Sequence, residues 1–376
     1  LEGNYLYIEA GQNRGKYYLI IDSKENSTAD GDATDIDTIS ILSDSTEGFN
    51  EGDKFIVIDR VYAREGANSA NLYLTKDGTA TSPITWNTNG TVIIDGEKER
   101  SKCIYINAAN YIEINGFILE NAKNYGIHLY GNSDYVYIKN NLILNNGSGE
   151  TYDGGIWADY RWPSNFDWLV LEGNIVFDNM NRGILLEGGG SSNPFENGVV
   201  KDNIIYSNLS AGLTYSSNGA TNRGGVIKDN ILFANSGGIY LGATADQKII
   251  KNLVFSNSGS GISLPGSAVT NNYVINNTFV NNSDGIQFPT HWTGDASNNI
   301  VKNNILAWNT DDGLDDDTTA GSNTYDFNLY YGNTTDYEGA GSIGSNSITG
   351  QDPLFFWEVQ ATADDGGTSS MIYDAS

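Results

Sequence analysis

Short bursts of alternating apolar and polar residues recur along the chain, and most of them open with a glycine. The pattern Gly-Ile-x-apolar-x is clearest at 155–159 and recurs in modified form at 183–187. Copies begin at glycines 126, 155, 183, 212, 238, 261, 285 and 313, with Cys103 in the same slot of the first copy. Successive copies therefore lie 23 to 29 residues apart. Alternation with a period of two predicts strands, and a repeat of this length made of strands and turns predicts one coil of a parallel β-helix.

A second repeat places an asparagine between two apolar stretches in most coils. Its members are Asn141, Asn174, Asn203, Asn230, Asn277 and Asn304. Asparagine tolerates left-handed backbone, and its side chain hydrogen-bonds to nearby backbone groups. We therefore interpret these residues as a structural ladder at one bend of every coil.

The whole chain is predicted to be all-β, a single-stranded parallel β-helix with an N-terminal cap. Residues 1–75 are assigned to the cap and first strands, 76–325 to the coils, and 326–376 to a C-terminal closing segment of the same domain. A cap is expected because the first coil would otherwise expose a sheet edge and an open core. The lone cysteine, Cys103, allows no internal disulfide and is expected to be a small buried residue.

Outward-facing residues of the repeated phrase are the candidates for chemistry. Because alternate strand residues point to opposite faces, stacked phrases form two outward columns. One column contains His128, Trp157 and Tyr240, and the other contains Tyr130, Asp159 and Glu187. We expect the carboxyl groups of Asp159 and Glu187 to lie roughly 5 Å apart, on consecutive coils. Their repulsion should raise the pKa of one of them, which is the arrangement of a retaining glycosidase.

The longest coils surround this pair, with surplus residues at 145–153, 160–167, 188–197 and 216–224. These segments are predicted to be loops that wall a cleft over the two acids. They contribute aromatic side chains suited to stacking on sugar rings, including Tyr152 and Phe195, and Trp157 is expected to be exposed for the same purpose. The expected substrate-binding residues are Asp153, Trp157, Tyr160, Trp162, Arg182 and Tyr240.

Catalytic roles divide by environment. Asp159 is expected to be the nucleophile, kept ionised by Arg161, and Glu187 the acid, although Arg182 nearby opposes that assignment. A rival set is His128, Tyr130 and Arg161, which could act as base and acid in a lyase or epimerase of uronate polymers. Neither outward column holds a Lys or an Arg, which disfavours the rival.

Charge and composition limit the classes of molecule that the protein is expected to bind. The net charge of −27 argues against a nucleic-acid partner, and no apolar run of eighteen residues predicts insertion into a membrane. The acidic run 311–317 lacks the spacing of an EF-hand, so a solvated loop is favoured there over a calcium site. The carboxylate mechanism requires no metal, and calcium is the one cofactor that the sequence leaves open.

Two further segments make a resemblance specific. They are Gly-Thr-Ala-Thr-Ser-Pro-Ile-Thr-Trp with Ile-Ile-Asp-Gly at 78–96, and Asn-Leu-Tyr-Tyr-Gly with Asp-Pro-Leu-Phe between 328 and 355. With the Asn-Asn coils, they resemble the right-handed parallel β-helix, or pectate-lyase-like, superfamily of carbohydrate-active proteins, over about residues 50–360. The superfamily includes lyases, epimerases, glycoside hydrolases and phage tailspikes, and the resemblance is specific for fold rather than reaction.

The resemblance implies a polysaccharide partner and an extracellular or virion-associated protein, monomeric or, as a viral spike, trimeric. A polysaccharide-degrading glycoside hydrolase is the first hypothesis for function. A uronate lyase or epimerase is the second, and a non-catalytic glycan-binding tailspike or adhesin is the third.

Overall fold

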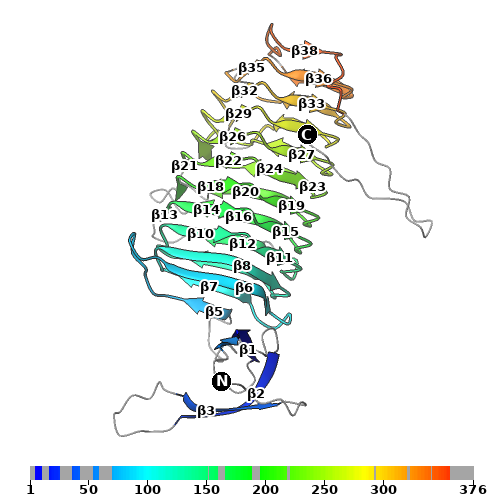
Figure 1. Ribbon diagram of the computed structural model, residues 1–376. Helices are drawn as coiled ribbons and strands as arrows, with labels where there is room; N and C mark the ends of the chain where they lie inside the picture. The colour runs from blue at the N-terminus through cyan, green and yellow to red at the C-terminus, as the bar shows by residue number, and fades with distance from the viewer. Residues whose placement is uncertain are drawn as a thin grey trace, which may run out of the picture.

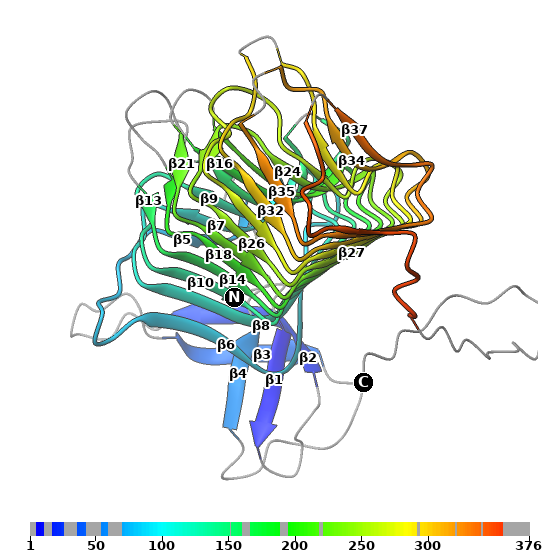
Figure 2. The same ribbon diagram turned by 90° about the horizontal axis from the view of Figure 1, so that it is seen from above.

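The computed structural model describes residues 5–10, 17–25, 36–42, 54–58 and 70–355, except 151, 160–165, 189–194, 218–220, 292–293, 320–321 and 340. The described residues form strands and turns without a helix. Accordingly, this part of the chain has no helix long and apolar enough to cross a membrane. From β5 to β38 the chain winds into stacked coils, which Figure 1 shows from the side and Figure 2 from above. The predicted parallel β-helix is confirmed.

One face of the solenoid is an eleven-stranded parallel sheet, called here the long sheet. Its strands are β5 (Ala70–Leu74), β7 (Lys102–Asn107), β9 (Tyr125–Tyr130), β12 (Gly154–Asp159), β16 (Arg182–Gly188), β20 (Ala211–Ser217), β24 (Gly237–Leu241), β28 (Ile262–Ser263), β31 (Ile286–Phe288), β34 (Asp312–Asp316) and β37 (Thr335–Gly339). The strands from β7 to β34 contain the repeated phrases, β5 and β37 flank them, and each strand pairs with its neighbour in the adjacent coil.

Two further ladders form the other faces and join at the long strands β6 (Ile84–Asp95) and β8 (Ile112–Glu120). The first contains β10 (Val136–Lys139), β14 (Leu169–Glu172), β18 (Val199–Lys201), β22 (Val226–Lys228), β26 (Lys248–Ile250), β29 (Tyr273–Ile275), β32 (Ile300–Lys302) and β35 (Thr324–Asp326). The second contains β11 (Leu142–Leu144), β15 (Ile175–Phe177), β19 (Ile204–Tyr206), β23 (Ile231–Phe233), β27 (Leu253–Phe255), β30 (Thr278–Val280), β33 (Ile305–Ala307), β36 (Leu329–Tyr331) and β38 (Ile348–Thr349).

Two small sheets complete the description. Short strands pair in parallel in the order β13 (Phe166–Asp167), β17 (Phe195–Glu196), β21 (Asn222–Arg223) and β25 (Thr244–Ala245). Near the N-terminus, β1 (Tyr5–Ala10), β2 (Tyr17–Glu25), β3 (Ile36–Leu42) and β4 (Lys54–Ile58) form an antiparallel sheet in the order β3-β2-β1-β4. Solenoid strands therefore extend from Ala70 to Thr349, while the three-part division of the chain stays a prediction.

The glycine of each phrase is required by a close approach between coils. A Cβ at Gly155 would lie 2.6 Å from the carbonyl oxygen of Gly183 and 2.6 Å from Val176 in the interior. A Cβ at Gly183 would lie 2.6 Å from the carbonyl oxygen of Gly212 and 2.7 Å from the side chain of Ile205. Cys103 fills this slot in the first copy and is fully buried, as predicted.

Asparagine ladders hold the bends together. The side-chain oxygen of Asn203 accepts hydrogen bonds from the backbone and side-chain nitrogens of Asn174 at 2.9 and 3.0 Å. Its amide in turn donates to the carbonyl of Leu171, so every buried polar group of the bend has a partner. The predicted ladder is confirmed. A second one runs from Asn146 to Asn333 at the neighbouring bend, where the chain enters the long sheet.

Stacks of aliphatic side chains fill the interior. The long sheet contributes the inward residue after each glycine slot: Ile104, Ile127, Ile156, Ile184, Leu213, Ile239, Ile262, Ile286 and Leu314. Each is buried, and burying one such side chain stabilises the fold by roughly 1.5–3 kcal/mol. The stack fixes the register of the long sheet and therefore the outward columns on which the site is built.

Candidate functional site

The register of the long sheet places Asp159 beside Glu187. On β12 and β16, Trp157 pairs with Leu185 and Asp159 with Glu187. On the other side, His128 and Tyr130 of β9 pair with Trp157 and Asp159. The two carboxylates therefore occupy one outward column on consecutive coils.

Outward here does not mean exposed. Asp159 is 4% exposed and Glu187 is 6% exposed, so both carboxylates lie in a largely desolvated setting. The expectation that Trp157 is an exposed aromatic platform is wrong, because its side chain is also only 4% exposed. Desolvation strengthens electrostatic interactions among these groups compared with a bare sheet surface.

Stacking with neighbouring rings explains the burial of Trp157. Its ring lies nearly parallel to that of His128, with 4.7 Å between centroids and 6° between planes. Tyr152 stacks on it at 5.4 Å and 8°, and Tyr125 packs at 4.9 Å in a tilted orientation. The stack continues from His128 to Tyr105 at 5.1 Å. Trp157 thus belongs to an internal aromatic column rather than to a free sugar-binding surface.

Two basic side chains lie next to the carboxylates. The Nε2 atom of His128 is 3.8 Å from Oδ2 of Asp159. Arg182 opens β16, and burial lowers the pKa of its guanidinium, an effect opposed by attraction to Glu187 and to the hydroxyl groups of Tyr152 and Tyr240. Arg182 is therefore electrostatically coupled to Glu187. The basic neighbours of the two acids therefore differ: a histidine lies by Asp159, and an arginine is coupled to Glu187.

Asp153 has a structural environment. Its carboxylate is buried and accepts hydrogen bonds from the side-chain amide of Asn124, the backbone and hydroxyl of Ser148, and the backbone of Glu150. These contacts hold the turn that leads into β12. The turn in turn places Tyr152 against Trp157.

The structure describes some of the residues predicted to bind substrate or to lie in loops, but not others. Tyr160, Arg161 and Trp162 lie outside the described residues, so their roles stay predictions. Phe195, expected as a loop aromatic, is fully buried in the core beside Tyr215, with 5.3 Å between the rings. Tyr240 is 37% exposed on β24 and is available to a ligand.

The described ends of three long loops form β13, β17 and β21, which with β25 make a short parallel sheet. This ladder was not predicted, because strands of two residues carry too little alternation to be recognised. Whether the loops wall a cleft over the two acids stays a prediction.

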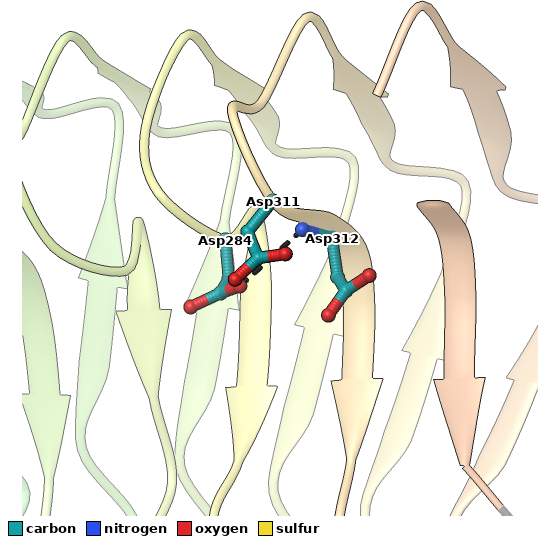
Figure 3. Close-up of side chains that lie close together, drawn as sticks. All are labelled: Asp284, Asp311 and Asp312. Carbon is teal, nitrogen blue, oxygen red and sulfur yellow. Dashed lines mark hydrogen bonds between the residues drawn. The ribbon is translucent and has the colours of Figure 1, made fainter. Parts of the chain in front are cut away.

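The sequence favoured a solvated loop for the acidic run 311–317, and this prediction is wrong. Asp312–Asp316 form β34, in which Asp312, Asp315 and Asp316 are buried. Figure 3 shows Asp284 from the preceding coil beside Asp311 and Asp312. One carboxylate oxygen from each lies within 4.8 Å of the others. Sequence analysis missed Asp284, although it precedes Gly285 as Asp312 precedes Gly313, and alignment of the repeats reveals this match.

Comparisons with known proteins agree with the fold. Residues 75–248 match the family model described as "Right handed beta helix region", and residues 172–347 match "Periplasmic copper-binding protein (NosD)". No curated protein sequence matches significantly. The resemblance to right-handed β-helix proteins drawn from the sequence is therefore confirmed for the fold.

Solved structures give the same result. The GH136 lacto-N-biosidase from Eubacterium ramulus superposes with a TM-score of 0.54 at 10% identity over 74% of this chain. The chain spans 59% of that enzyme's length. A periplasmic alginate epimerase superposes with a TM-score of 0.51 at 14% identity, covering 76% of this chain and 79% of the epimerase. At such low identity the likeness shows the fold alone.

The residues do not fit a copper centre. Copper sites in proteins use histidine, cysteine and methionine ligands. Within residues 172–347 the sequence has one histidine, His291, one methionine, Met180, and no cysteine. Among the described residues, the group of three ligand-bearing side chains close enough to share an ion consists of aspartates. Carboxylates favour a hard cation instead.

Proposed function

We propose that the protein is a carbohydrate-active enzyme, a retaining glycoside hydrolase that cleaves a neutral or weakly charged polysaccharide with Asp159 and Glu187. The observation that carries the proposal is their pairing in register on β12 and β16. Adjacent parallel strands are about 4.8 Å apart, and the carboxyl groups of retaining glycosidases are about 5–5.5 Å apart. In this reaction one carboxylate attacks the anomeric carbon while the other protonates the departing oxygen. The second residue then takes a proton from the water that releases the sugar.

The neighbours suggest the division of roles. Arg182 attracts Glu187 and so favours its ionised form, which suits the nucleophile. Asp159 then carries the proton, which is the reverse of the assignment expected from Arg161. His128 gives this proton a polar neighbour, with its Nε2 atom 3.8 Å from Oδ2 of Asp159. Water is largely excluded from both acids, which strengthens the effect of each charge on the other.

The side chains proposed to contact the sugar are exposed ones around Asp159 and Glu187. Tyr152 and Tyr240 are both partly exposed and both interact with Arg182. Their rings offer faces for stacking on a sugar, while Trp157 supports Tyr152 from beneath. Tyr160 and Trp162 complete the proposed binding set. Asp153 acts through the turn that it holds.

The test is a pair of amide variants assayed on neutral and uronate-containing polysaccharides. Asp159→Asn and Glu187→Gln should each lower the release of reducing ends by about 10²–10⁴-fold. On an aryl glycoside whose leaving group needs no proton, Asp159→Asn should keep its first step and Glu187→Gln should lose it. The opposite pattern would restore Asp159 as the nucleophile. Asp178→Asn, an exposed carboxylate with positive φ at the bend between β15 and β16, is the control and should keep full activity.

A lyase or epimerase is the second candidate. The observation in its favour is that His128 lies 3.8 Å from Asp159, while Tyr130 pairs with Asp159 in register. Such a His-Tyr-Asp group could remove the proton at carbon five of a uronate and protonate the leaving oxygen. New absorbance near 235 nm, lost in His128→Ala and kept in Glu187→Gln, would replace the hydrolase proposal with this one. Glycan retention without either product would identify a binding protein.

We also place the protein outside the cytoplasm, either secreted or periplasmic. Support comes from the match of residues 172–347 to a periplasmic family model and from the polysaccharide substrate proposed above. Fractionation of the native source, followed by detection with an antibody, tests this. Recovery in the cytoplasmic fraction alone would contradict it.

A further inference from the structure

A second group of carboxylates lies on the same outward face, at the C-terminal end of the long sheet. Asp284 and Asp312 precede the glycines of consecutive coils, and Asp311 is the next residue before Asp312. The backbone nitrogen of Asp312 donates to Oδ1 of Asp284 at 3.3 Å. One oxygen from each of the three side chains lies within 4.8 Å of the others, as Figure 3 illustrates. The repeat therefore brings together ligands that the sequence separates by 27 residues.

The carboxylate of Asp312 has an unsatisfied oxygen. Its side chain is 4% exposed, and its buried Oδ1 accepts no hydrogen bond. Asp315, on the same outward face of β34, is 8% exposed and also has a buried Oδ1 without a partner. An ionised oxygen that is removed from water without a donor is costly, unless a cation binds it. These orphaned oxygens are independent of the clustering of the acids and indicate a missing positive partner.

In the described part of the chain, polar side chains surround these aspartates. Ser260 donates to Oδ2 of Asp284 at 3.1 Å and to the side-chain oxygen of Gln287 at 3.0 Å. Gln287 donates through its amide to Oδ2 of Asp315 at 3.1 Å. The ion pairs found in the described part of the chain involve none of these aspartates.

We propose that Asp284, Asp311 and Asp312 bind a calcium ion between β31 and β34. Calcium takes six to eight oxygen ligands at about 2.3–2.6 Å, so two of its ligands are at most about 5 Å apart. The 4.8 Å limit on the three oxygens fits this range. Magnesium demands a near-ideal octahedron with ligands at about 2.0–2.1 Å and gives up its waters reluctantly, so a site formed by three aspartates suits calcium better. Asp311 is exposed, so water has access to complete the coordination sphere.

The ion would brace the last coils of the solenoid. It would neutralise two buried carboxylates on adjacent strands and satisfy Oδ1 of Asp312. This site is separate from the Asp159–Glu187 pair, because four strand pairings lie between β16 and β31 in the long sheet. The calcium proposal therefore does not depend on the proposed function.

The test is calcium titration of the full chain after treatment with a chelator, followed by calorimetry and thermal unfolding. Calcium alone should bind to one site and raise the Tm by at least about 2–4 °C, while magnesium at the same concentration should have a smaller effect. Asp311→Asn should weaken calcium binding by at least about tenfold, since affinity follows the number of charged ligands. Asp311 is exposed, so this variant should fold normally.

The Asp312→Asn variant distinguishes the role of Asp312 as a calcium ligand from its effect on the stability of the calcium-free protein. Without calcium it should be at least as stable as the unmodified protein, because the amide removes a buried, repelled charge. The calcium-dependent rise in its Tm should nevertheless be lost. Asp178→Asn is the matched control and should bind calcium normally. The proposal is overturned if the unmodified protein shows no calcium binding at 10-millimolar concentrations (on the order of ten times the weakest calcium sites of extracellular modules), or if Asp311→Asn and Asp312→Asn bind calcium as the control does.

Discussion

The long sheet carries two groups of buried outward carboxylates with opposite surroundings. Asp159 and Glu187 lie among aromatic rings, with His128 beside one and Arg182 coupled to the other. Asp284 and Asp312 lie among Ser260, Gln287 and further aspartates, and none of the ion pairs between described residues involves them. The same repeat supplies the spacing in both places. The difference teaches that the neighbouring charges, rather than the spacing, separate the two proposals, proton transfer for one pair and cation binding for the other.

The largest expected contrast is in activity. Asp159→Asn should lower polysaccharide hydrolysis by about 10²–10⁴-fold, because a group of the reacting pair is lost. Asp312→Asn, assayed at the same temperature well below unfolding, should keep activity within about twofold of the unmodified protein. Initial rates of reducing-end release measure both. Equal losses in the two variants would remove the distinction between the regions.

The aromatic column should matter to stability as well as to binding. Trp157→Ala removes a ring packed against His128, Tyr152 and Tyr125 and should lower the free energy of unfolding by about 3–5 kcal/mol. Tyr240→Ala, at a partly exposed position, should cost much less. Urea unfolding followed by circular dichroism measures both. A negligible loss in Trp157→Ala would mean that this ring is a surface group after all.

The stability of the protein should depend on pH through Asp315, because its buried carboxylate lies near other acids. Burial, with Asp317, Asp284 and Asp312 nearby, raises its pKa from the ordinary value of 3.8 to about 6, against the hydrogen bond from Gln287. A raised acid pKa means that folding disfavours the charged form. The penalty is therefore absent below about pH 4, grows between pH 4 and 6, and is complete above pH 6.

Asp315→Asn removes that penalty. In the presence of a chelator, the variant should have a higher Tm than the unmodified protein at pH 8, and the difference should disappear near pH 4. Thermal scans across this range measure it. A variant that is less stable at pH 8 would show that the carboxylate of Asp315 is stabilising, and that the acidic region is already neutralised.

Removal of calcium with a chelator should have the smallest effect on the rate of hydrolysis. Removal of calcium should lower the Tm while leaving hydrolysis at 25 °C unchanged, because no ligand of the proposed ion belongs to the reacting pair. Activity and Tm measured on the same chelated sample test this. Loss of activity that calcium restores, without unfolding, would place a cation in the reaction and favour the lyase candidate.

The sequence by itself determined the fold and the position of the carboxylate pair. Glycine spacing predicted the coils, the asparagines predicted a ladder at one bend, and the period of two placed Asp159 and Glu187 in one column. These features are local or repeat at a fixed interval, so they can be read without knowing what packs against them. The same reasoning could have paired Asp284 with Asp312 by their shared place before the glycine.

Only the tertiary structure decided the environment of each group. The burial of Trp157 depends on Tyr152, which a turn held by Asp153 delivers, and no periodicity encodes that contact. The coupling of Arg182 to Glu187 arises within one strand, but its strength depends on burial by distant residues. The acidic run became a strand with orphaned oxygens because the neighbouring coils, with Leu314 in the core stack, placed it in the long sheet. Register follows from the chain's own pattern, whereas desolvation and counter-charge come from whatever the fold brings alongside.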